Sequence, residues 1–404
     1  MSQQPNKPYN PLFNRTYLKY LGFAVAIVIV ILSERPPAPL EQPVPTANAS
    51  SQLKVLRVEN LQQQRLILSF ATYPALTQNS KITRHLAAKA LRDKTRQYPN
   101  IHAVLWTYDR LEVELRWTQD KGERVNISLQ NTLYRLFNVN PDFNNQSNRK
   151  LIAAQYYLEN KQADTALLAA LEEGLAGQYR SPTKIAQLLY TPATTILITD
   201  RKTTAKFIAD LDQQIAQLLQ TQLTALPESF DWQAKSTHIE QRNRQHNLLI
   251  ATELEVLNNL QGKIELLANF VLGDILNRQL PTKKIRFRLI KQQIFKRGYQ
   301  SIVLSSDTVM TDSLLDIIND EVNNANFDDE LTLVKDRLIK QYTTLIDDRE
   351  RLFKLYSKKQ FYRLKTQSAA EYTAQLNSIT SEQVRSLMRR FSAEPTYTIF
   401  LKPS

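Results

Sequence analysis

Histidine and carboxylate side chains are the residues of this chain that could hold a metal ion or move a proton. The sequence contains four histidines. His238 and His246 flank Glu240 across a predicted loop and strand, and His102 opens another strand. Ligands of one metal ion must reach a common point, which this spacing does not provide. We therefore interpret these side chains as solvated surface residues and leave His85 as the candidate that needs its context.

Several kinds of chemistry are excluded by what the sequence lacks. There is no cysteine, so disulfides, zinc thiolates and a cysteine nucleophile are absent. There are seven glycines and no match to a phosphate-binding glycine loop or to the G-x-S-x-G turn of serine hydrolases. The net charge of +13 favours binding to an anionic surface, such as nucleic acid or anionic lipid head groups. Because a membrane segment is present, a lipid surface explains this charge better than nucleic acid.

Residues 17–33 are predicted to be a transmembrane anchor. The run from Leu21 to Leu32 carries no charge, and aromatic and basic residues just before it extend the span into the interface. Three cations precede the run, which places residues 1–16 in the cytoplasm and the bulk of the chain across the inner membrane, in the periplasm or another extracytoplasmic space.

A cleaved signal peptide is the alternative to an uncleaved anchor. The small residues at 47–49 resemble a cleavage site, but they lie well beyond the apolar run and behind several prolines. Residues 34–51 are better interpreted as a Pro-rich linker that holds the folded part away from the bilayer.

Beyond the linker, the periodicities predict two similar α+β domains, 52–226 and 227–404, each a mostly antiparallel sheet covered by helices. In the first half we predict strands at 65–72, 102–108, 110–118 and 194–199, and helices at 80–95, 147–174, 181–190 and 203–220. In the second half we predict strands at 246–252, 285–290, 299–305 and 397–401, a helix at 261–280 and a helical section over 312–391.

Three segments of the second half resemble the insulinase/pitrilysin (inverzincin) zinc peptidases. The segment L-G-D-I-L-N-R-Q-L at 272–280 is similar to a helix ending of that family, and K-R-G at 296–298 matches a motif before one of its strands. The closing I-T-S-E-Q-V at 379–384 is similar to the family's last helix. The resemblance implies paired homologous α+β halves, two pairs of which enclose a peptide chamber.

The family's zinc site is H-x-x-E-H on the first helix, completed by a glutamate from a later helix. Here the corresponding helix contains H-L-A-A-K at 85–89, so Ala88 replaces the general base and Lys89 replaces the second histidine. On the later helix, Ala154 lies near the position of the third ligand. A lysine ammonium repels Zn²⁺. The resemblance therefore implies a degenerate, non-catalytic member with no zinc of its own, in which His85 caps or packs.

Two further family positions are also changed. The arginine and tyrosine with which the family grips substrate backbone fall on Ile294 and Ser301. The cation-rich segment 283–297 would place Lys284, Arg286 and Arg288 on one face of a strand. We interpret this segment as a solvated or edge-protecting face, with contact to lipid head groups left open.

The function expected from this resemblance is that of a membrane-anchored, non-catalytic subunit. It would pair with a catalytic insulinase-like subunit that holds the zinc, or else self-associate, and shape the peptide chamber. Two alternatives stay open. One is an envelope scaffold or assembly protein with no protease link, and the other is an active zinc endopeptidase with an unrecognised site. The identity of the partner, the substrate and the host pathway does not follow from the sequence.

Overall fold

In the computed structural model, the described residues are 53–404 with gaps at 99, 119–130, 160, 178–181, 183, 227–231, 234, 240–243, 255–258, 295–296, 310, 394–395 and 403–404. The predicted cytoplasmic N-terminus, the anchor with Leu21 and Leu32, and the whole linker lie outside these residues. No helix in the described part of the chain has the length and apolar character that crossing a bilayer requires.

The first half of the chain forms a mixed sheet in the strand order β1-β5-β2-β4-β3, with β6 beside β5. β1 and β6 pair with β5 in parallel, and the other neighbours are antiparallel. The strands are β1 (Leu53–Val58), β2 (Gln64–Thr72), β3 (Ile101–Trp106), β4 (Arg110–Trp117), β5 (Leu189–Asp200) and β6 (Thr224–Ala225).

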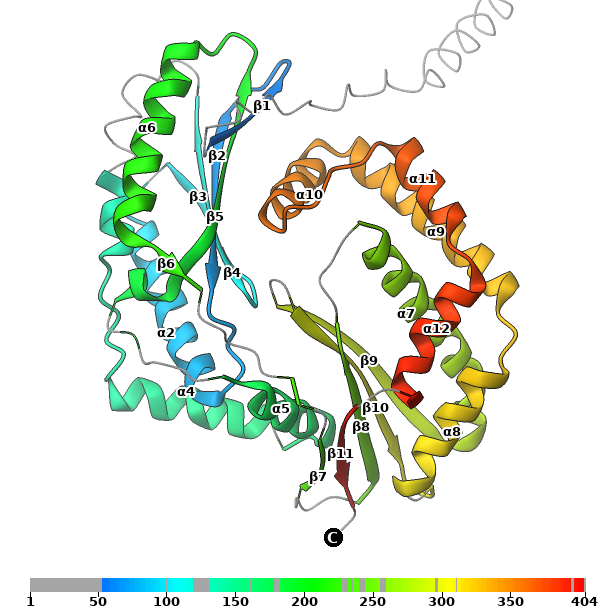
Figure 1. The fold of residues 1–404 in the computed structure, drawn as a ribbon. Helices are drawn as coiled ribbons and strands as arrows, with labels where there is room; N and C mark the ends of the chain where they lie inside the picture. Colours follow the sequence, from blue (N-terminus) through cyan, green and yellow to red (C-terminus); the bar gives the residue numbers. More distant parts are fainter. Residues whose placement is uncertain are drawn as a thin grey trace, which may run out of the picture. The chain divides into compact units, whose positions relative to one another are not determined.

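Helices cover one face of this sheet, where Figure 1 shows α2 and α6 lying along it. The helices are α2 (Gln78–Thr95), α4 (Gln146–Glu159), α5 (Ala163–Leu175) and α6 (Ala205–Gln222), with a 3₁₀ turn η2 at Ile185–Leu188. The single helix predicted over 147–174 is therefore two helices. The helix predicted over 181–190 is wrong, since it is a short 3₁₀ turn that leads into β5.

The second half repeats the plan with a sheet in the order β7-β11-β8-β10-β9. β7 pairs with β11 in parallel, and the remaining pairs are antiparallel. The strands are β7 (Ser236–Ile239), β8 (His246–Glu253), β9 (Ile285–Ile294), β10 (Arg297–Ser306) and β11 (Tyr397–Leu401). The sheets confirm the α+β fold class, while the domain boundary at residue 227 stays a prediction.

The helical section of the second half is divided into five helices after the long helix α7 (Asn259–Gln279) and a 3₁₀ turn η3 at Pro281–Lys283. α7 and α12 pack together over the second sheet, as Figure 1 shows. The five helices are α8 (Thr311–Asn324), α9 (Asp328–Asp347), α10 (Arg349–Phe361), α11 (Ala369–Ser378) and α12 (Ser381–Ala393).

Each sheet has its second face covered by a helix from the other half of the chain. Phe353 and Tyr356 of α10 pack against Ile67 of β2, so every residue of β2 is buried. In return, the leucines of α5 pack against β8, β10 and β11 through a shared apolar cluster. The two halves are thus joined by apolar contacts that involve the central strands of both sheets.

Candidate functional site

The helix that carries the degenerate motif is fixed at its N-terminus by a capping box. Thr77 accepts a hydrogen bond from the backbone N–H of Ser80, and the Ser80 hydroxyl accepts one from the N–H of Thr77. Lys81, Arg84 and Ala88 then recur at helical spacing, which brings them to one side of α2. The cap thus fixes the residue at which α2 begins, and the helical spacing then sets which of its side chains lie on the side of α5.

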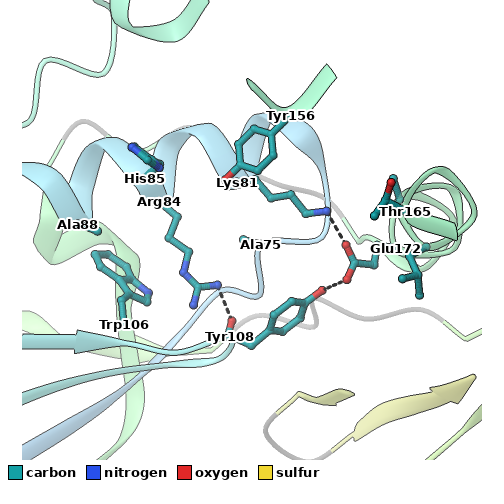
Figure 2. A pocket seen from close by; sticks show the side chains of 12 residues that line it. Ala75, Lys81, Arg84, His85, Ala88, Trp106, Tyr108, Tyr156, Thr165 and Glu172 are labelled. Carbon is teal, nitrogen blue, oxygen red and sulfur yellow. Dashed lines mark hydrogen bonds and ion pairs between the residues drawn. The ribbon is translucent and has the colours of Figure 1, made fainter. Parts of the chain in front are cut away.

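A pocket of about 520 Å³ lies between α2 and α5. His85 and Ala88 of the degenerate motif are among its lining residues. Figure 2 shows Arg84 pointing from α2 towards Tyr108 and Lys81 reaching across to Glu172 on α5. Its polar or aromatic lining consists of Lys81, Arg84, His85, Trp106, Tyr108, Tyr156, Thr165 and Glu172. Its small and aliphatic lining consists of Ala75, Ala88, Leu168 and Ala169.

Glu172 is the carboxylate among these described lining residues, and both of its oxygens are engaged. Its Oε2 lies 2.6 Å from Nζ of Lys81. Its Oε1 accepts hydrogen bonds from the hydroxyls of Tyr108 at 2.5 Å and of Tyr299 at 2.9 Å. Burial, reinforced by the nearby carboxylate, raises the pKa of both tyrosines, so their hydroxyls stay protonated as donors. Because Tyr299 belongs to β10, this buried group links the two halves.

Arg84 is the second cation of the pocket and is held without an acidic partner. Its Nη1 donates to the carbonyl oxygen of Tyr108 at 3.0 Å, and its guanidinium lies 6.0 Å from the ring centre of Trp106. Desolvation lowers the pKa of Arg84 to about 10, although nearby tyrosines and Asp109 act in the opposite direction. The side chain is therefore charged at neutral pH.

The residues present do not fit a zinc ion. His85 lies at the pocket, but the next functional position of the motif is occupied by Ala88, and Lys89 after it is exposed to solvent. The available carboxylate, Glu172, is already bound to an ammonium and two hydroxyls, and Arg84 adds a positive charge that opposes a dication. Among the described residues, no group of three histidine, aspartate or glutamate side chains is placed to hold a metal ion.

The structure separates the other predicted site positions from this pocket. Ala154 lies on α4, whereas the helix that faces α2 with a carboxylate is α5. Ile294 is buried in the apolar cluster between the halves, and Ser301 lies fully buried in the centre of the second sheet. Neither is at the pocket lining formed by the described residues.

The remaining histidines are not brought together by the described structure. His102 is exposed on β3, and His238 on β7 stacks on Phe400 with ring centres 5.0 Å apart. His246 opens β8, while Glu240 lies outside the described residues.

The basic segment 283–297 is partly neutralised by acidic residues of the same chain. Arg288 pairs with Asp164 at 2.9 Å, and Lys291 pairs with Glu265 at 2.6 Å. Lys284 lies in a left-handed turn with φ of 57° rather than on β9, while Arg286 and Arg288 are both exposed. β9 is an edge strand, for which charged side chains are the usual protection.

Glu172 is not among the predicted site residues, although the sequence contains a signal for it. It occupies the apolar stripe of α5 formed by Leu168, Leu171 and Leu175 at helical spacing. A carboxylate on a buried stripe needs a partner, which predicts a polar cluster. Its partners Lys81, Tyr108 and Tyr299 come from three other elements, and no local pattern connects them.

Comparison with known proteins identifies the fold of this chain. No protein-family model matches the sequence, and no curated protein sequence matches it. Solved structures do match. The inactive domain of a peptidase M16 from Pseudomonas fluorescens is similar with a TM-score of 0.64 at 16% identity, covering 90% of this chain and 98% of that chain.

Two further structures show the same likeness. The periplasmic protease PqqL from Escherichia coli has a TM-score of 0.59 at 12% identity and covers 91% of this chain, which spans 48% of the PqqL chain. A putative M16-like peptidase from Alicyclobacillus acidocaldarius has a TM-score of 0.57 at 11% identity, with coverage of 91% and 100%. The chain therefore has the two-domain fold of the insulinase (M16) peptidases.

Proposed function

We propose that this chain is a non-catalytic M16-like subunit that pairs with a catalytic zinc peptidase homologue and shapes its peptide chamber. The observation that carries the proposal is the composition of the pocket on α2. Ala88 stands where a general base would be needed, and the charges of Lys81 and Arg84 oppose a metal ion. Zinc is expected in the partner subunit alone.

The chemistry of the pocket supports this assignment. Peptide hydrolysis by a zinc peptidase needs a metal-bound water and a carboxylate that takes its proton. At the motif positions an alanine cannot take a proton and Lys89 cannot bind zinc, while Glu172 is held by three donors. The inactive M16 domain among the similar structures is a precedent for this fold without catalysis.

Pairing is supported by the surface of this chain. The chain spans 48% of the similar PqqL chain. Helix α4 exposes Leu151, Tyr157 and Leu158 at 73%, 66% and 60%. Leu151 and Leu158 lie two turns apart on one face of the helix. Such an apolar face on a helix is typical of a surface that a partner covers.

The proposed location is the extracytoplasmic side of the inner membrane, with residues 17–33 as the anchor. The cations before the apolar run and the Pro-rich linker after it support an orientation with the N-terminus inside. A reporter that works only after export from the cytoplasm is expected to be active when it is fused after Ser404. Activity from a reporter that works in the cytoplasm alone would contradict this orientation.

The test of pairing is purification of the tagged full-length chain from detergent-solubilised membranes, with mass spectrometry of what accompanies it. We expect a second M16-like chain with an intact H-x-x-E-H motif. The double variant Leu151→Ser/Leu158→Ser should lose that chain, while Leu333→Ser, an exposed leucine on α9 at 66%, should keep it. Purification with envelope-assembly proteins alone would instead favour the scaffold alternative.

A further inference from the structure

The guanidinium of Arg84 is a half-buried cation that no described carboxylate contacts directly, although Asp109 attracts it from farther away. Its neighbours include a backbone carbonyl oxygen at 3.0 Å and the rings of Trp106 and Tyr108, with ring centres at 6.0 and 5.9 Å. No carboxylate in the described part of the chain forms an ion pair with it. One N–H of the planar fork is bound to the carbonyl, and the Arg84 side chain lines the pocket.

The net charge of the pocket follows from its three ionised groups. Lys81 and Glu172 neutralise each other at 2.6 Å, so among the charged lining residues Arg84 leaves an excess of one positive charge, which Asp109 outside the lining offsets only in part. A desolvated cation without a counter-ion is costly, and an arriving anion would remove that cost. An arginine fork binds a carboxylate through charge-assisted hydrogen bonds.

The shape and lining of the pocket limit what else the anion can carry. Its volume of about 520 Å³ is in the range of pockets that bind small molecules. Leu168 and Ala169 of α5 form an apolar wall, and Trp106 adds an aromatic one. The ligand should therefore place an apolar group beside its charge.

We propose that this pocket binds a carboxylate that is attached to a small apolar group, such as the C-terminal residue of a peptide or a free branched-chain acid. Arg84 receives the carboxylate, and the walls formed by Trp106, Leu168 and Ala169 receive the apolar group. A doubly charged phosphate fits less well, because Lys81 is committed to Glu172 and one excess positive charge would not balance it. The proposal concerns this chain alone and holds whether or not the chain pairs with a peptidase.

The experiment is isothermal titration calorimetry on the full-length chain in detergent with four probes. These are N-acetyl-Ala-Leu as the free acid, the same dipeptide as its C-terminal amide, 3-methylbutanoate and inorganic phosphate. The free acid should bind about tenfold or more tightly than the amide, since only the acid offers a charge to the arginine fork. Tighter binding of the dipeptide acid than of 3-methylbutanoate identifies a peptide source, and the reverse identifies a free acid.

Two variants locate the binding. Arg84→Gln should lower the affinity for the free acid to that for the amide. Lys89→Gln, which removes a charge from an exposed position on the same helix, should leave the affinity for the free acid unchanged. Equal affinity for acid and amide, no binding of the acid at millimolar concentration, tighter binding of phosphate, or equal effects of the two variants would each overturn the proposal. The comparison of acid with amide uses the unaltered chain and decides the question even if Arg84→Gln does not fold.

Discussion

The buried carboxylate of Glu172 provides a quantitative test of how the two halves are joined. Its contacts are Lys81 and Tyr108 in the first half and Tyr299 in the second. The substitution Glu172→Gln removes the charge, leaves the Lys81 ammonium without its counter-ion and offers one oxygen in place of two. The remaining amide oxygen can still accept from both tyrosine hydroxyls, but the NH2 group then faces the Lys81 ammonium and cannot accept from it.

The expected cost follows from the burial of each partner. Removing one member of a buried ion pair costs about 3–5 kcal/mol. The Lys81 side chain is 25% exposed and can regain water, so we expect the lower end, a loss of about 3 kcal/mol in the free energy of unfolding. Tyr299→Phe removes one hydrogen bond without leaving a charge unpaired and should cost about 1 kcal/mol.

Urea denaturation followed by tryptophan fluorescence and far-UV circular dichroism measures these changes. Glu173→Gln is the matched control, because Glu173 is the exposed neighbour on the same helix and its loss should stay within about 0.5 kcal/mol. A cost for Glu172→Gln no larger than that of the control would refute the view that this group joins the halves.

Four other substitutions test separate parts of the structure. A Cβ at Gly298 would lie 2.3 Å from a backbone carbonyl oxygen of β9, so Gly298→Ala should destabilise the protein by about 2 kcal/mol or more in urea titration, whereas Gly273→Ala, with ordinary contact at 3.5 Å inside a helix, should be neutral or stabilising. The hydrogen bond from Arg65 lowers the pKa of Glu350. The stability contribution of Glu350 is therefore complete above its unfolded pKa of about 4.3 and is lost as the pH falls through the lower folded value. The difference in the free energy of unfolding between the unaltered protein and Glu350→Gln should stay constant between about pH 7 and 5 and disappear below about pH 4. A difference that grows on acidification would contradict this sign. Elemental analysis should find well below one zinc per chain, unchanged in His85→Ala; one zinc per chain that His85→Ala removes would contradict the assignment.

Much of the fold could be predicted from local patterns. The alternation of Leu111, Val113, Leu115 and Trp117 predicts β4, where all four side chains are buried. The apolar stripe over 261–280 predicts α7, which runs from Asn259 to Gln279. The strand β7 was missed, because its four residues pair only with β11, far away in the sequence.

Less of the candidate site could be predicted, because it depends on contacts between distant elements. The degenerate motif lies on α2, and two of its residues, His85 and Ala88, line the pocket, while their role stays a prediction. The hydrogen bond between Glu172, which lines the pocket, and Tyr299 joins α5 to β10. No spacing along the chain reveals that pair, since it forms only when the two halves pack together.

Peptide hydrolysis by the chain reconstituted with its M16-like partner tests the central claim most directly. The measurement compares the complex with two variants, His85→Ala in this chain and Glu→Gln at the base of the partner's H-x-x-E-H motif. We predict that the partner variant abolishes hydrolysis and that His85→Ala leaves the rate unchanged. Hydrolysis by this chain without a partner, lost on His85→Ala, would contradict the account.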